Sequence, residues 1–187
     1  MQTVFKRNSE NKDRRSSEQN PDIAQQFDVH YPRIYNYLRY RVSSQEDVED
    51  LISTIFERAY TRRTQYDQSK GSFSTWLFRI AHNTLANHYR THERRSIWET
   101  EAEPPADLIT SEPSLENQLV QQETIARLMR GLENLSERDQ ELISLKFAGQ
   151  LRNREIGEIM DMKEKTVSVS LLRAMRRLRK QVEKEVA

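Results

Sequence analysis

The residues of this sequence best suited to a chemical role are the cations near its C-terminal end. Positions 163–184 hold eight lysines and arginines but only two acids. Local basic patches of this kind favour nucleic-acid binding, whatever the net charge of the whole chain. A solvated basic face on an ordinary terminal helix is the plainer alternative. The secondary structure that carries these cations distinguishes a nucleic-acid-binding surface from a solvated face.

Three histidines suggest a metal site as a competing chemistry. His88 and His92 lie one helical turn apart, and His82 precedes them. No motif fixes a third ligand and the sequence has no HExxH pattern, so we expect no metal. The chain also has no cysteine, no Ser/His/Asp order and no glycine-rich phosphate loop. We therefore expect no catalytic residue and no cofactor.

The basic run lies on a predicted helix-turn-helix. We expect a short helix from Asn153 to Met160 and a long helix from about Glu164, separated by the three-residue corner 161–163. This spacing is what the DNA-binding motif requires. At 100° per residue, the long helix has an apolar stripe opposite its basic face. The predicted stripe consists of Val167, Leu171, Ala174, Met175, Leu178 and Val182.

A helix of this kind can rest on its own domain and enter a major groove with its basic face. Its first residues would then be nearest the base edges: Lys165, Thr166, Ser168 and Val169. Three arginines further along would be better placed for phosphates: Arg173, Arg176 and Arg177. The short preceding helix and the tight corner favour the DNA-binding interpretation over a solvated face.

A second polar surface is predicted on the helix within residues 71–90. One face is most simply a core face, formed by Phe73, Trp76, Leu77, Ile80 and Thr84. Around the other side follow Arg79, His82, Asn83, Asn87 and Arg90. Amides and guanidinium groups can hydrogen-bond to bases and phosphates, and aromatic rings can stack on unpaired bases. An amphipathic helix with a polar face is commonplace, so this pattern alone is weak.

The helix over residues 47–60 opens with three acids, Asp47, Glu49 and Asp50. Acids at a helix start interact favourably with the helix dipole, which is the simplest explanation. The more specific explanation is that these acids form a surface that docks on another protein.

Composition predicts an all-α fold. Of the 187 residues 35% are hydrophobic and 32% are charged, with four glycines and five prolines, which favours two thin helical cores over one thick core. Residues 27–95 and 121–187 each carry a net charge of +3, whereas residues 96–120 carry −6. Prolines and scattered acids predict a flexible acidic linker there. No run approaches the roughly 18 apolar residues of a membrane span, so we expect a soluble, cytoplasmic protein.

Four sequence motifs and an acidic linker occur in a fixed order: DVEDLI with F.RAY, then F..WLFRIA.N, the linker, LSERDQELISLKF.G, and a helix-turn-helix that ends in RAMRRLR. In this order and spacing they resemble the sigma-70 family of RNA polymerase sigma factors, in its compact extracytoplasmic-function (ECF) group. The resemblance implies two small helical domains. They are region 2 at residues 23–95 and region 4, the helix-turn-helix domain, at residues 115–187, after an arm at 1–22 and a linker at 96–114.

The resemblance also implies functional residues. The polymerase-docking surface would contain Asp47, Glu49, Asp50, Ser53, Phe56 and Arg58. The helix that opens and recognises the −10 promoter element would use Phe73, Trp76, Arg79, Asn83, Asn87, His88 and Arg90. Duplex −35 recognition would use Lys163, Lys165, Thr166, Ser168, Val169, Arg173, Arg176 and Arg177. The expected partners are core RNA polymerase, promoter DNA and an anti-sigma factor, which would be able to hold the chain near the membrane. The acidic linker would suit a basic polymerase channel, and neutralising its acids should impair initiation.

Three positions depart from the family pattern. Ser53 and Thr54 stand where glutamine and an acid are frequent, which is expected to alter polymerase docking in detail. Asn87 stands where aspartate is frequent. Ser168 and Ser170 replace a common basic pair, so we expect −35 affinity to depend more on the remaining cations.

Two other functions compete with a sigma factor. A helix-turn-helix regulator with its own sensor or dimerisation domain would bind duplex DNA as a symmetric dimer without polymerase. It leaves the helix of residues 71–90 and the acidic stretch without a role. A helical hydrolase or metal enzyme lacks any catalytic constellation.

Overall fold

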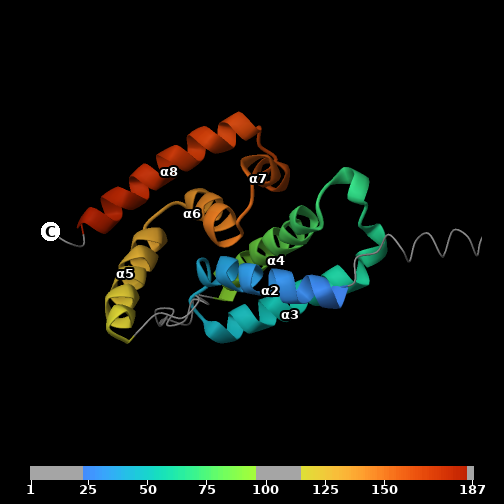
Figure 1. Ribbon diagram of the computed structural model, residues 1–187, viewed down its shortest axis with the longest axis horizontal. Coiled ribbons are helices and arrows are strands. Elements are labelled where there is room, and N and C mark those ends of the chain that lie inside the picture. The colour runs from blue at the N-terminus through green and yellow to red at the C-terminus, as the bar shows by residue number, and fades with distance from the viewer. Residues whose placement is uncertain (1–22, 96–114, 185–187) are drawn as a thin grey trace, which may run out of the picture.

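The computed structural model describes residues 23–95 and 115–184, with side chains described for 26–91 and 124–184. Within these ranges all regular structure is helical (Figure 1). The elements are α2 (Ile23–Arg39), α3 (Gln45–Thr61), η1 (Arg63–Gln65), η2 (Gln68–Lys70), α4 (Phe73–Arg95), α5 (Leu115–Glu133), α6 (Glu137–Ile143), η3 (Ser144–Ala148), α7 (Asn153–Met160) and α8 (Glu164–Lys184). None of the helices in these ranges is long and apolar enough to cross a bilayer. The all-α prediction is confirmed, whereas the predicted arm and linker lie outside the described residues.

Helices α2, α3 and α4 pack together into one bundle. The chain turns between α2 and α3, where the Ser44 hydroxyl accepts a hydrogen bond from the Asp47 backbone N–H at 3.2 Å. This cap satisfies one of the free N–H groups at the start of α3. The short turns η1 and η2 then lead to α4, whose side chains form the polar surface that the sequence predicted.

In the second half of the chain, α8 packs along α5, α6 and α7. Both helices of the predicted helix-turn-helix begin where expected, at Asn153 and Glu164. Helix α6 ends at Ile143, and the chain continues as a wide π-type turn, η3. The Ser136 hydroxyl caps α6 by accepting a hydrogen bond from the Asp139 backbone N–H at 3.3 Å.

The hydrophobic core is not divided along the chain as the sequence suggested. The larger cluster combines residues of α2, α3 and α4 with residues of α6, α7 and the first half of α8. The smaller cluster joins α5 to α6 and the second half of α8, for example through Leu132, Ile143 and Leu178. The two halves of the chain therefore pack against each other, as α2 does against η3 and α4 against α7.

Two residues of the predicted apolar stripe of α8 are not fully buried: Val182 is partly buried against the smaller cluster, and Met175 is exposed. Met175 was expected on the buried stripe of α8, but its side chain is 38% exposed. It lies at the edge of that stripe, where the neighbouring helices no longer cover α8. Val167, Leu171, Ala174 and Leu178 are buried as predicted.

Candidate nucleic-acid interface

The corner between α7 and α8 has the geometry of a helix-turn-helix. Asp161 adopts the left-handed conformation (φ 53°, ψ 51°), which ends α7 and turns the chain sharply. The turn brings the Met162 carbonyl so close to Gly157 that a Cβ atom there would lie 2.4 Å from that oxygen. Only glycine fits this approach. Buried Ile156 and Ile159 of α7 then hold α8 in place through the core that they share with Val167 and Leu171.

The corner before α8 and the outer surface of α8 present the side chains that the sequence assigned to duplex DNA. All eight are exposed: Lys163, Lys165, Thr166, Ser168, Val169, Arg173, Arg176 and Arg177. Two of them have partners within the protein. Ser168 accepts a hydrogen bond from Nδ2 of Asn153 at 2.9 Å and donates one to the Glu164 carbonyl at 3.1 Å. Arg177 forms an ion pair with the buried Asp139 carboxylate at 2.6 Å.

The polar surface of α4 is largely exposed. Arg79, Asn83, Asn87 and Arg90 all face solvent, and the Arg90 guanidinium donates to the side-chain oxygen of Asn87. His88 is half-buried and its ring lies edge-on to Tyr89. This face therefore carries amide and guanidinium donors over several turns of one helix.

An aromatic cluster stands at the start of α4. The rings of Phe73 and Trp76 lie 5.3 Å apart, and Tyr66 lies 5.4 Å from Phe73 and 5.6 Å from Trp76. Phe73 and Trp76 are half-buried rather than fully enclosed in the core. Tyr66 was not among the predicted site residues, because it precedes α4 in a segment that has no helical periodicity.

The first turn of α4 is contacted by acids of α7. Glu155 accepts hydrogen bonds from the hydroxyls of Ser72 at 3.0 Å and Thr75 at 3.1 Å, and from the Arg152 N–H at 2.8 Å. Burial raises the pKa of Glu155, but these hydrogen bonds outweigh it, so the pKa lies below its ordinary value. One turn further along α4, Arg79 donates to the Glu158 carbonyl at 2.9 Å.

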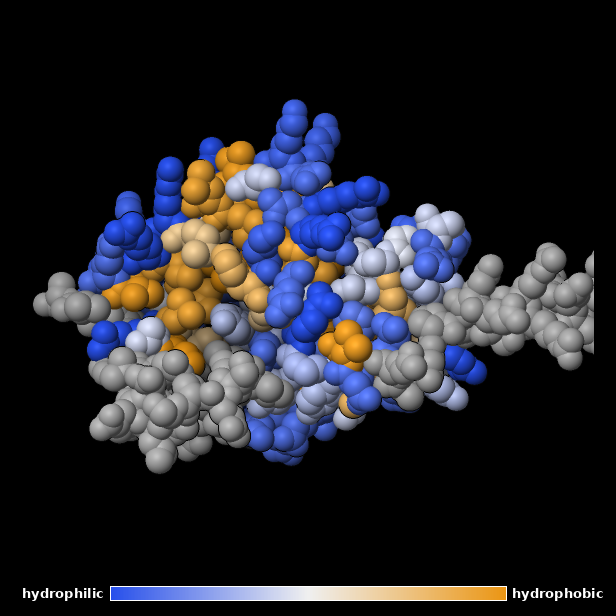
Figure 2. Space-filling view, viewed as in Figure 1, coloured by the Kyte–Doolittle hydropathy of each residue, from blue (hydrophilic) through white to orange (hydrophobic). Residues whose placement is uncertain are grey.

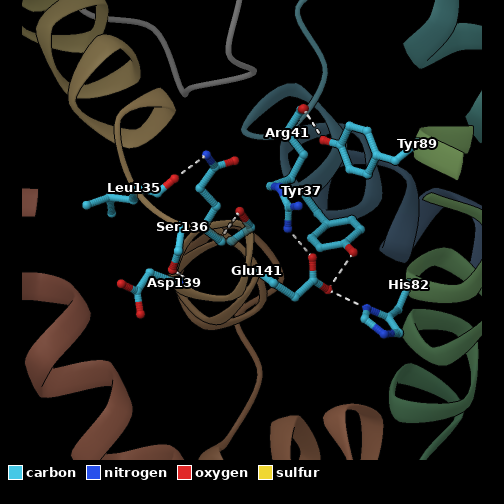
Figure 3. Close-up of polar contacts among 10 residues, drawn as sticks. Tyr37, Arg41, His82, Tyr89, Leu135, Ser136, Asp139 and Glu141 are labelled. Atoms are coloured by element: carbon cyan, nitrogen blue, oxygen red, sulfur yellow. Dashed lines mark hydrogen bonds and ion pairs between the residues drawn. The ribbon is translucent and has the colours of Figure 1, made fainter. Parts of the chain in front are cut away.

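A buried carboxylate joins the two halves of the chain. Glu141 of α6 points between α2 and α4, where it accepts hydrogen bonds from Tyr37 at 2.8 Å and pairs with His82 at 2.7 Å (Figure 3). It also forms an ion pair with Arg41, and both side chains of this pair are less than a tenth exposed. Burial, and then the Glu141 charge, hold the pKa of Tyr37 well above its ordinary value, so its hydroxyl stays a donor. Neither Glu141 nor Arg41 was among the site residues predicted from the sequence.

The predicted docking residues of α3 fall into two groups. Glu49, Asp50 and Ser53 are exposed along its outer face, and Asp47 is half-buried at its first turn. The remaining two are turned toward the protein and are partly structural. These are Phe56, whose ring lies 4.4 Å from Phe27, and Arg58, which donates to the Thr84 hydroxyl at 2.9 Å.

No group of three His, Asp or Glu side chains within the described ranges is arranged to hold a metal ion. His82, which the metal hypothesis considered, is directed at Glu141 instead. The side chain of His92 lies outside the described residues.

Two family models match the chain, one in each half. Sigma-70 region 2 matches residues 27–95, and Sigma-70, region 4 matches residues 125–178. The ECF RNA polymerase sigma factor BldN of Streptomyces coelicolor is 28% identical over 152 residues, which are 81% of this chain and 57% of BldN. The chain thus spans little more than half of that relative. SigM of Bacillus subtilis, also an ECF RNA polymerase sigma factor, is 26% identical over 159 residues, 84% of this chain and 93% of SigM.

Two solved structures share the fold. The sigma factor RpoE of Bartonella quintana, in complex with the anti-sigma factor NepR, has a TM-score of 0.70 at 19% identity and covers 87% of this chain and 97% of its own. CnrH in complex with the cytosolic domain of CnrY has a TM-score of 0.64 at 18% identity, and the match covers 90% of this chain and 92% of the solved chain.

Proposed function

This chain belongs to the sigma-70 family, in its ECF group. On that premise we propose that its two halves contact different parts of the promoter when transcription starts. It is an alternative sigma factor, which directs core RNA polymerase to specific promoters. We propose that α8 recognises the −35 element as duplex DNA, that α4 engages the melted −10 strand, and that α3 docks on the polymerase.

The observation that carries this proposal is the presence of two different nucleic-acid surfaces in one chain. The exposed cations of α8 suit a duplex, because they follow one face of a helix that a tight corner presents to the groove. The surface of α4 suits single-stranded DNA, because amide and guanidinium donors lie beside the aromatic cluster of Tyr66, Phe73 and Trp76. A duplex-binding regulator has no use for the second surface.

The packed arrangement of the two halves constrains when these surfaces can act. Glu155 and the Glu158 carbonyl occupy the first turns of α4, including Arg79. Glu141 engages His82 on the same helix. We infer that α6 and α7 must move away from α4 before its first turns can contact DNA, so the packed form is a resting form.

Docking on polymerase is assigned to the exposed part of α3. Glu49, Asp50 and Ser53 offer an acidic, solvent-facing surface that a basic partner surface would complement. Arg58 belongs to the support of this surface, because its guanidinium ties α3 to α4. The role of the chain is positioning and melting, and the polymerase performs the chemistry.

We further propose an anti-sigma factor as a partner and the cytoplasm as the location. The fold is shared with RpoE, a sigma factor solved together with the anti-sigma factor NepR. A partner that bound both halves in their packed form would keep the first turns of α4 covered by α7.

The test is reconstitution with core RNA polymerase. The purified chain should co-elute with core polymerase and should support run-off transcription from its promoter, when neither component alone does so. A regulator would bind duplex DNA as a dimer and would not co-elute. The double variant Glu49→Ala, Asp50→Ala should lose co-elution while a control, Glu133→Ala at an exposed acid of α5, keeps it. Co-elution that survives the double variant would remove α3 as the docking surface.

A further inference from the structure

The DNA-facing side of α8 carries a line of four side chains in which two large apolar residues stand between two cations. Lys165, Val169, Leu172 and Arg176 follow one another at steps of four, three and four residues, which places them on one line along the helix. Val169 is 49% exposed and Leu172 is 54% exposed. Figure 2 shows apolar surface emerging along α8 between the hydrophilic side chains that project from it.

Exposed apolar side chains at neighbouring positions of one helix call for an occupant that covers them. The charge around them identifies a nucleic acid rather than an apolar protein surface. Lys165 and Arg176 flank the pair, Arg173 lies beside it, and positions 163–184 hold eight cations against two acids. A protein partner would have to neutralise these cations, whereas the phosphates on both sides of a major groove do so by their nature.

A polar side chain next to Val169, that of Ser168, already has partners within the protein. The single hydroxyl proton of Ser168 goes to the Glu164 carbonyl, and Asn153 donates to its oxygen. Ser168 is therefore a positioning residue that ties the start of α7 to α8, and it has no proton left to donate to a base. This leaves the centre of the line without a hydrogen-bond donor.

We propose that Val169 and Leu172 determine −35 specificity by packing against thymine C5-methyl groups in the major groove. Thymine is the one base that presents an apolar group there, so an apolar pair selects it. Three residues of helix rise about 4.5 Å, and neighbouring base pairs lie about 3.4 Å apart. The two side chains are therefore spaced to contact neighbouring A·T pairs. The inference rests on the proposed −35 role of α8 and adds which base its central residues select.

The size of the effect follows from burial of a methyl group. Burying one methylene is worth roughly 0.8 kcal/mol, which corresponds to about a fourfold change in affinity. Each contacted thymine that is replaced by deoxyuridine should therefore weaken binding about fourfold, because deoxyuridine lacks only the C5-methyl group.

The experiment uses the full chain assembled with core polymerase. Selection from promoters with a randomised −35 element should enrich thymine at two adjacent positions. Replacing those thymines by deoxyuridine should weaken wild-type binding about fourfold each, while Val169→Ala and Leu172→Ala should each lose the sensitivity at one position. Met175→Ala is the matched control, because Met175 is an exposed apolar residue of α8 outside the line, and it should respond as the wild type does.

Three results separate the possible failures. If deoxyuridine has no effect on the wild type, or the same effect on Val169→Ala, the methyl contact is wrong. If Val169→Ala leaves affinity and the selected sequence unchanged, Val169 does not select a base and the inference is overturned. If the double variant Arg173→Ala, Arg176→Ala also leaves duplex binding and its salt dependence unchanged, α8 is not the −35 helix and the proposed function itself fails.

Discussion

Replacing Glu141 by alanine should separate the two halves of the chain. The Glu141 carboxylate is the point at which α6 meets α2 and α4, and it accepts from Tyr37, Arg41 and His82 at once (Figure 3). Its removal leaves the Arg41 guanidinium, whose side chain is 4% exposed, without the carboxylate that faces it.

The magnitude follows from the burial of the pair. Breaking a buried ion pair by removing one partner costs about 3 to 5 kcal/mol, because the remaining charge stays desolvated. This is a large part of the roughly 5 to 15 kcal/mol that stabilises a typical protein. For a chain of this length the melting temperature should fall by roughly 6 to 20 °C. Replacing Glu141 and Arg41 together by apolar residues should cost less than the single change, because no buried charge is left.

The assay combines thermal unfolding followed by circular dichroism with small-angle X-ray scattering. Glu141→Ala should lower the melting temperature and increase the radius of gyration, since the halves no longer hold together. Glu137→Ala, at an exposed acid one turn earlier on α6, is the control and should change neither. A loss below about 1 kcal/mol with an unchanged radius of gyration would refute the reasoning, because exposed ion pairs are worth no more than that.

Three further predictions concern the supporting structure. Burial lowers the pKa of His30 from 6.5 to about 4, so the folded state binds a proton less readily than the unfolded state does. The free energy of unfolding should therefore be highest above pH 6.5 and should fall between pH 6.5 and pH 4. Urea titrations of His30→Gln should show a smaller fall over the same pH range. Gly157→Ala should cost about 1 to 3 kcal/mol in urea unfolding and weaken duplex binding, because the new methyl group meets the Met162 carbonyl; unchanged binding would contradict the corner geometry. Arg58→Ala should cost about 1 kcal/mol of stability through the lost bond to Thr84, whereas a variant that lost polymerase binding at full stability would make Arg58 a docking residue instead.

The sequence predicted best those features that are encoded locally. The start of α7, the corner and the start of α8 were all predicted correctly. The end of one amphipathic helix, the three-residue corner and the start of the next helix all lie close together in the sequence. The eight side chains assigned to duplex DNA, seven on α8 and Lys163 just before it, are exposed, although their role in −35 binding stays a prediction.

The contacts between the two halves could not be predicted in this way. Glu141 and Arg41 are 100 residues apart in the sequence, and each looks like an ordinary solvent-facing charge on its own helix. The Asn153–Ser168 hydrogen bond similarly depends on the angle at which α7 meets α8, which periodicity does not specify. Ser168 was therefore assigned to base contact, although its hydroxyl proton is already engaged.

The most direct test of the division of labour is permanganate reactivity of the −10 thymines in promoter complexes with core polymerase, measured together with binding to a −35 duplex. Wild-type chain should expose reactive thymines only with polymerase present. Asn83→Ala, at an exposed amide of α4, should reduce that reactivity several-fold while leaving −35 duplex binding unchanged. An equal loss of both signals would mean that Asn83 is structural. Full melting by the variant would contradict the assignment of α4 to the −10 strand.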